Sequence, residues 1–174
     1  MCHIVKWKGA HKVQTPIRCY KVVIKVYDEI NDKYSYHPVF CNSHKMTYEL
    51  GCTEKTRRPT RAGRFNMTVN EGLHSFKPEV LGWVGTARWV DLRLQDDSTF
   101  TFGEWKGVKA EAAVLECVIP AGALYFEGEA NCIFGGPDEK GFVSDTITPI
   151  KEVPRSAWPA MTFIEYSERN HHPC

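Results

Sequence analysis

The longest apolar run of the chain lies at residues 112–119 and sets the strongest limit on the fold. It reads Ala-Ala-Val-Leu-Glu-Cys-Val-Ile, and a Pro-Ala-Gly break and a second short apolar segment up to Glu127 follow it. Such β-branched and compact side chains fit a pleated strand better than a helix. Because apolar residues occupy almost every position, we expect a central strand that is buried on both faces. Pro120 ends the run and Gly122 frees the following turn, which disfavours the alternative of a short buried helix.

Length and composition are typical of a single globular domain. The chain has 174 residues, of which 43% are apolar, and a formal net charge of +1. We expect one domain over residues 1–174, with a core at residues 17–150 and a docked, aromatic and proline-rich tail at residues 151–174. The near-zero charge gives no reason to expect binding to nucleic acid or to an anionic membrane.

The sequence also bears on the compartment. No apolar run approaches the roughly 20 residues that a membrane helix needs. The first residues, Met-Cys-His-Ile-Val-Lys-Trp, lack the apolar core of a signal peptide. We therefore expect a cytoplasmic protein with no membrane partner.

Alternating apolar and polar residues predict further strands. Residues 18–27 and 34–40 are expected to form a hairpin through a polar turn. Short strands are expected at residues 45–50 and 142–147. Residues 88–105 alternate most clearly, with Gln-Asp-Asp-Ser between two apolar halves, and predict a second hairpin.

One helix is expected between these strands. Lys77, Pro78 and Glu79 resemble a first helical turn, with Ser75 as the N-cap, and the helix would end near Arg88. The expected fold is α+β, a mainly antiparallel sheet of seven to nine strands with one or two helices packed on it.

The cysteines are irregularly spaced, and no two form a C-x-x-C pair: they are residues 2, 19, 41, 52, 117, 132 and 174. This excludes a zinc ribbon and a thioredoxin motif. In a reducing compartment we expect them, Cys117 above all, to serve mainly as small apolar residues. Cys2 could become a nucleophile if Met1 is removed. A zinc site could also join the chain ends through Cys2, His3, His171, His172 and Cys174. We favour neither site, because chain ends are usually frayed, and we expect no metal or cofactor.

Residues 53–67 form a basic stretch with five cations, Lys55, Arg57, Arg58, Arg61 and Arg64. One interpretation is an arm that binds phosphate or nucleic acid. The other, which we favour, is a solvated loop. Two carboxylates, Glu116 and Glu127, flank the predicted turn after the central strand and could do acid–base work if some 5–9 Å apart. A solvated pair is the alternative.

The most promising polar motif is residues 71–76, Glu-Gly-Leu-His-Ser-Phe. We expect a short strand that opens into a turn at the start of the helix. Because free N–H groups and the helix dipole favour an anion there, His74 and Ser75 could hold a phosphate or carboxylate. A capping serine beside a structural histidine is the alternative. The full set of expected ligand-binding residues is Tyr20, Lys21, Tyr48, Glu71, His74 and Ser75.

Four segments together resemble a group of small, largely uncharacterised proteins common in bacteriophages. They are residues 19–23, 48–51, 71–76 and 116–126. Members of that group begin Met-Cys and carry a Gly-x-His-Ser/Phe-Phe element before a helix and a Cys-x-Ile-Pro-x-Gly strand. The resemblance spans roughly residues 17–128, and the chain departs from the group at residues 88–105 and in its tail. It implies a phage-type origin more than a reaction, and a protein that a phage encodes would then act in the host cytoplasm.

Three functions fit these observations. The one we favour is a phage-type accessory binding protein that sequesters or inhibits a host protein or a small anionic, nucleotide-like ligand. The second is an enzyme related to ADP-ribosyltransferases, with His74 and Glu127 as candidate residues. The third is a virion or assembly protein, with a homo-oligomer formed through the aromatic tail and the hairpin at residues 88–105.

Overall fold

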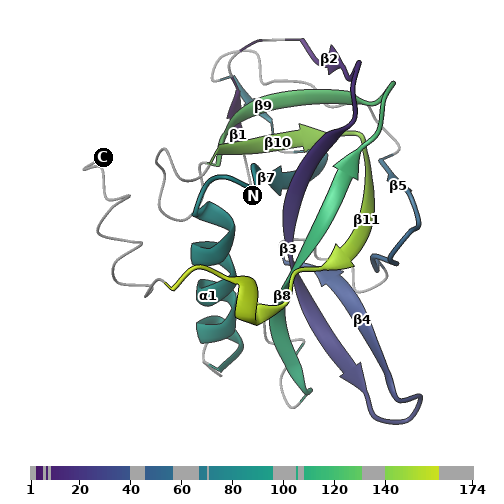
Figure 1. The fold of residues 1–174 in the computed structure, drawn as a ribbon, viewed down its shortest axis with the longest axis vertical. Helices are drawn as coiled ribbons and strands as arrows, with labels where there is room; N and C mark the ends of the chain where they lie inside the picture. Colours follow the sequence, from purple (N-terminus) through teal and green to yellow (C-terminus); the bar gives the residue numbers. More distant parts are fainter. Residues whose placement is uncertain are drawn as a thin grey trace.

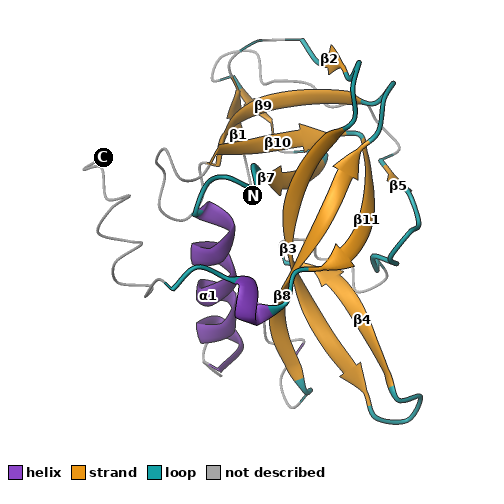
Figure 2. Ribbon diagram, viewed as in Figure 1, coloured by secondary structure: helices purple, strands orange, loops and turns teal. Residues whose placement is uncertain are grey.

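The fold combines one large antiparallel sheet with one α-helix, as the sequence predicts (Figure 1; Figure 2). It was analysed as a computed structural model that describes residues 3–5, 7, 9–39, 46–56, 67–69, 71–95, 105, 108–130 and 140–160. The sheet has eleven strands, more than expected, because several are only two or three residues long.

Two long strands, β3 (Ile17–Asp28) and β8 (Ala110–Ile119), form the centre of the sheet. They pair antiparallel without interruption from Ile17 opposite Ile119 to Val26 opposite Ala110. The predicted central strand is confirmed: Val114, Leu115 and Cys117 are fully buried. Its even and odd positions belong to different apolar clusters, so both faces of β8 lie in the core.

The strand order is β5-β11-β8-β3-β7-β10-β9-β1-β6. The flanking strands are β5 (Glu54–Lys55), β11 (Thr146–Glu152), β7 (Leu73–Phe76), β10 (Lys140–Ser144), β9 (Leu124–Ala130), β1 (His3–Val5) and β6 (Thr68–Val69). β8 and β9 are consecutive in the chain but do not pair, because β9 pairs with β10, β1 and β2 (His11–Lys12). In Figure 1, β9 and β10 run across the upper ends of β3, β8 and β11.

The predicted hairpin of residues 18–27 and 34–40 is confirmed, since β3 pairs with β4 (Lys33–Pro38). The short strand expected at residues 45–50 is wrong in its described part, where a single bridge joins Tyr48 to Tyr36. The strand expected at residues 142–147 is two strands, β10 and β11, that meet at Asp145.

The helix α1 (Gly82–Gln95) corrects two predictions. It begins after the predicted start, and Ser75 is no N-cap because it lies inside β7. It also occupies the first half of the predicted hairpin at residues 88–105, while residues 96–104 lie outside the described part. Val90, Leu92 and Leu94 do alternate with polar residues. However, four apolar residues that pack on the sheet, Trp83, Ala87, Val90 and Leu94, are three or four positions apart, which is the helical period.

Each face of the central strands has its own core. α1 covers one face and packs on a cluster that includes Val22, Ile24, Phe76, Trp83 and Val114. The opposite face packs a second cluster that includes Cys19, Val23, Leu115, Phe142 and Ile147. After β11 a short 3-10 helix, Arg155–Ala157, leads to Trp158, which is buried against the helix cluster. In the described part of the chain, no helix is long and apolar enough to cross a membrane.

Candidate functional site

Lys21 is the most unusual polar residue of the core. It lies on β3, and its side chain enters the face of the sheet opposite α1. The residue is 7% exposed, its Nζ donates a hydrogen bond to the backbone oxygen of His74 at 2.7 Å, and it lies 5.1 Å from the centre of the Tyr48 ring. No carboxylate among the described residues pairs with it. A cation in this position has lost most of its water without gaining a counter-charge.

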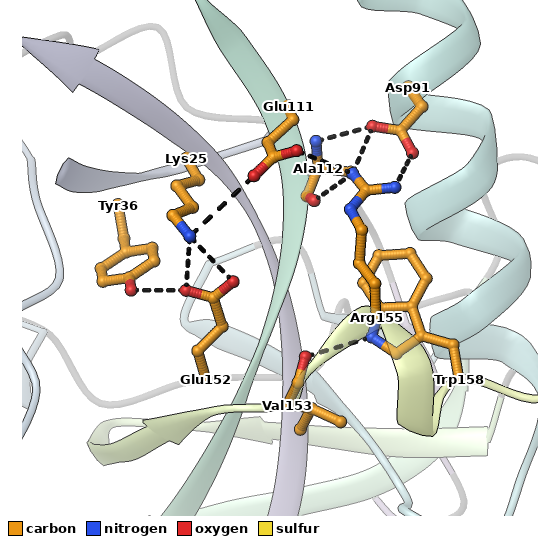
Figure 3. Close-up of polar contacts among 9 residues, drawn as sticks. All are labelled: Lys25, Tyr36, Asp91, Glu111, Ala112, Glu152, Val153, Arg155 and Trp158. Carbon is orange, nitrogen blue, oxygen red and sulfur yellow. Dashed lines mark hydrogen bonds and ion pairs between the residues drawn. The ribbon is translucent and has the colours of Figure 1, made fainter.

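Lys25, four residues further along the same strand, shows the ordinary arrangement. Its Nζ lies 3.0 Å from the Glu152 carboxylate and 3.9 Å from that of Glu111. Tyr36 donates a hydrogen bond to the same Glu152 at 2.7 Å (Figure 3). Two lysines on one face of one strand therefore differ in their partners: Lys25 pairs with carboxylates, whereas Lys21 has none among the described residues.

Ser75 lies beside Lys21. Tyr20 of β3 is opposite Phe76 of β7, so the antiparallel register places the next pair, Lys21 and Ser75, on the same face. Ser75 is 1% exposed, and its hydroxyl has no hydrogen-bond partner among the described residues. An ammonium has three N–H donors and Lys21 uses one of them. The pair thus offers two unused N–H groups and an unused hydroxyl.

The structure brings part of the predicted site together and separates the rest. Lys21, Tyr48 and Ser75 share one face of the sheet, where Tyr48 is also buried. His74 contributes its backbone oxygen there, but its ring points to the other face, because neighbouring residues of a strand alternate. Tyr20 also faces away, toward Trp83 of α1. Glu71 is exposed in the turn before β7.

The motif at residues 71–76 is therefore a strand and not a strand-to-helix turn. The first helical N–H groups begin at Gly82, and Lys77 to Leu81 form turns in between. The helix dipole is thus no part of the anion site expected at His74 and Ser75. The charge of Lys21 takes its place as the feature that favours an anion.

His74 has a partner that the sequence did not reveal. Its Nδ1 lies 2.8 Å from Nδ1 of His3, and the two ring centres are 4.9 Å apart. His3 is fully buried, and Nε2 of its ring has no partner in the described residues. Burial, the nearby N-terminal charge and Lys21 lower the pKa of His3 to about 3, so the ring is neutral at pH 7. One ring donates its Nδ1–H and the other accepts it, so the two Nδ1 atoms hold one proton between them.

The two candidate carboxylates are both engaged in ion pairs. Glu116 pairs with Arg18 at 3.0 Å and with Lys151 at 3.8 Å, and the hydrogen bond from Arg18 lowers the pKa of Glu116. Glu127 pairs with Lys77 at 2.6 Å. They lie on β8 and β9, which do not pair with each other.

A second polar cluster ties the tail to the helix. Arg155 binds both oxygens of Asp91 on α1, at 2.9 and 3.0 Å, and donates to the backbone oxygen of Ala112 at 2.7 Å (Figure 3). Asp91 also accepts the backbone N–H of Ala112 at 2.8 Å. These contacts join groups of the cluster to one another, so we interpret it as a structural clasp. No pattern in the sequence indicates this cluster, because its members come from three distant segments.

The remaining candidates lie largely outside the described residues. They are Cys2, residues 57–66 of the basic stretch, and the C-terminal His171, His172 and Cys174. Within the described ranges, no three His, Cys, Asp or Glu side chains gather as metal ligands. The described residues therefore provide a buried cation beside a hydroxyl.

Comparison with protein families, with curated proteins and with solved structures finds no match to this chain.

Proposed function

We propose that this chain is an accessory binding protein, of the type that phages encode, which holds a small anionic ligand at Lys21. The single observation that carries this is the buried Lys21 ammonium with one neutral acceptor and no carboxylate among the described residues. A buried charge without a partner costs free energy, and such costs concentrate at functional sites. A ligand that brings the missing negative charge would recover this cost on binding.

The chemistry around Lys21 favours a phosphate-like or carboxylate group. Lys21 offers two N–H donors beyond the one that binds His74, and the Ser75 hydroxyl is unused. Charge-assisted hydrogen bonds of this kind are stronger than neutral ones. Tyr48 lies over the Lys21 ammonium, so its ring would have to move aside or stack on the ligand. A nucleotide fits both requirements, since it combines phosphate with a flat base.

A thermal-shift and calorimetry screen tests this function. Full-length protein would be measured with inorganic phosphate, AMP, ADP, ATP, NAD+ and cyclic dinucleotides. A ligand at 100 times its Kd stabilises the folded state by about 2.7 kcal/mol, which raises Tm by roughly 5–10 °C for a chain of this size.

Lys21→Met and Lys25→Met make a matched pair of variants on one strand face. Lys21→Met removes the unpaired buried charge, so we expect the free protein to gain about 1–3 kcal/mol and to lose the ligand response. Lys25→Met breaks the pair with Glu152 and should weaken the fold while keeping the response. If no anion shifts wild-type Tm more than that of Lys21→Met, the proposed function is wrong. Consumption of NAD+ that His74→Ala and Glu127→Ala both abolish would instead favour the ADP-ribosyltransferase alternative.

A further inference from the structure

Cys19 and Cys117 face each other across the two central strands. They are direct partners in the antiparallel register of β3 and β8. This register continues along the strands in both directions and ends at Ile17 and Ile119 in one of them. Both are free, fully buried and members of the same apolar cluster, so both thiols lie on the same face of the sheet. The sequence places them almost a hundred residues apart and gives no hint of the pairing.

The backbone geometry of this pair suits a disulfide. Directly opposite residues of an antiparallel pair have Cα atoms about 4.5–5.5 Å apart, inside the range of about 4.4–6.8 Å that disulfides span. Their Cβ atoms, about 4.5–5.5 Å apart in such pairs, need to approach by roughly 1 Å to reach the usual disulfide separation. A small change in local twist supplies this movement, so the strands need not separate.

The surroundings distinguish the two thiols. Burial raises the pKa of Cys19 to about 11. The Ser75 hydroxyl and the Lys21 ammonium lower this pKa, although Ser75 Oγ does not meet hydrogen-bond geometry with the thiol. Burial also raises the pKa of Cys117, and the neighbouring Cys19 raises it further. The Cys117 thiol points back toward the Leu115 oxygen, at 3.5 Å. Cys19 is therefore the thiol that ionises first, two residues from the unpaired cation.

We propose that Cys19 and Cys117 are a reversible dithiol–disulfide pair that a peroxide oxidises, with Cys19 as the attacking and Cys117 as the resolving cysteine. The Cys19 thiolate attacks one oxygen of hydrogen peroxide, the O–O bond breaks, and Cys19 becomes a sulfenic acid while hydroxide leaves and takes up the proton that Cys19 released. The Cys117 sulfur then attacks the sulfenic sulfur, an S–S bond forms, and the hydroxyl leaves as water with the Cys117 proton. In total, two thiols and one peroxide give one disulfide and two waters.

Peptide mapping of the full-length protein tests the pair directly. Protein would be treated with hydrogen peroxide, its remaining thiols alkylated under denaturing conditions, and its peptides analysed without reduction. We expect a linked peptide containing Cys19 and Cys117 that dithiothreitol separates. The link closes a loop of roughly 100 residues in the unfolded chain, so the oxidised form should melt about 10 °C higher. Between pH 7 and 9 the rate should rise about tenfold per pH unit, because the thiolate fraction grows by that factor below the thiol pKa.

Single variants separate the roles of the two thiols. Cys117→Ala should leave Cys19 as a sulfenic acid that dimedone labels, whereas Cys19→Ala should leave Cys117 almost unlabelled. The control is Cys52→Ala, since Cys52 is exposed and lies outside the pair, and it should form the linked peptide at the wild-type rate. Recovery of both Cys19 and Cys117 as free thiols once Cys52 is fully oxidised would overturn the assignment, as would a link from Cys19 to any other cysteine. Both of those outcomes are read from the wild-type protein, so they do not depend on the folding of a variant.

Discussion

The hydrogen bond between His3 and His74 joins the first described strand to the middle of the sheet. It links β1 to β7, which are separated in the sheet by β10 and β9. The two rings can share one proton in their bond, and a second proton at that point would place two N–H donors against each other. The contact therefore needs at least one Nδ1 without a proton, which ties the position of β1 to pH.

This pair makes the stability depend on acidity. The pKa of His3 is about 3 in the folded protein and about 6.5 in an unfolded chain. Because the folded value is depressed, the contribution is complete above pH 6.5 and is lost as pH falls from 6.5 toward 3. The slope in that window is at most about 1.4 kcal/mol per pH unit.

Urea unfolding at pH values from 7.5 to 4.5 would measure this loss. His3→Phe should flatten the profile, while His11→Asn, at an exposed histidine, should leave it unchanged. An unaltered slope in His3→Phe would contradict the assignment of the effect to His3.

Two glycines let the strands beside His3 approach closely. Gly128 and Gly141 are opposite each other on β9 and β10. A Cβ at Gly141 would overlap the backbone oxygen of Ser75 and lie 3.1 Å from Nε2 of His3. Gly141→Ala should therefore destabilise the fold by about 3 kcal/mol or more, because the obstacle is backbone that cannot turn away.

Gly9 provides the comparison for this substitution. Nothing lies within 4 Å of the Cβ that Gly9→Ala would add, so we expect a change within about 0.5 kcal/mol. Both values would come from urea unfolding of the full-length variants. Equal stabilities for the two variants would show that the close approach at Gly141 is not required.

The prediction that His74 and Ser75 share one turn was wrong for a simple reason. Assigning residues 71–76 to a turn places His74 and Ser75 on one surface, whereas a strand sends them to opposite faces. Lys21 and Tyr48 were named from the sequence and do meet. What the sequence could not show is that no carboxylate of the described residues accompanies Lys21, since its surroundings come from β3, β7 and the segment around Tyr48.

At the scale of elements, the strands were easier to predict than the helix. β3, β4 and β8 carry clear β-branched or alternating patterns, and all three are present. The pattern of α1 is weak because Gly82 and Gly85 lie in its first turn and a polar alternation covers its second half. Packing on β3 and β8 stabilises this helix where local propensity does not.

The segment after β11 depends on Trp158 for its attachment. The indole is 7% exposed, lies between the guanidinium groups of Arg88 and Arg155, and packs edge-on against Trp83. Trp158→Ala should cost about 3–5 kcal/mol in urea unfolding, because a large buried ring leaves a cavity. Lys151→Ala, at an exposed position nearby, should change stability by less than about 1 kcal/mol. A cost for Trp158→Ala as small as that of Lys151→Ala would mean that the indole is not packed as described.

At the scale of the molecule, the two long strands should be the last part to open. β3 and β8 are buried on both faces, whereas β5 and β6 are two-residue strands at the ends of the sheet order. Native-state hydrogen exchange should therefore be slowest for amides of residues 19–24 and 112–117 and fast at residues 54–55 and 68–69. Faster exchange in the central strands than at the ends would contradict this ranking.

The class of fold was predictable because it depends on patterns within short segments. The order of the strands was not, since β8 and β9 look like neighbours in sequence and yet belong to different parts of the sheet. Pairing between strands far apart in the sequence depends on which of their faces can be buried together. The residue pattern of one segment does not contain this information.

This separation has a consequence for synthesis on the ribosome. β3 leaves the exit tunnel long before β8 exists, and its earlier neighbours, β4 and β7, lie along its other edge. The edge of β3 that pairs with β8 must stay unpaired while roughly ninety further residues are translated, for several seconds at the usual elongation rate. A nascent chain arrested before residue 110 should therefore engage holdase chaperones, and one released after residue 160 should not.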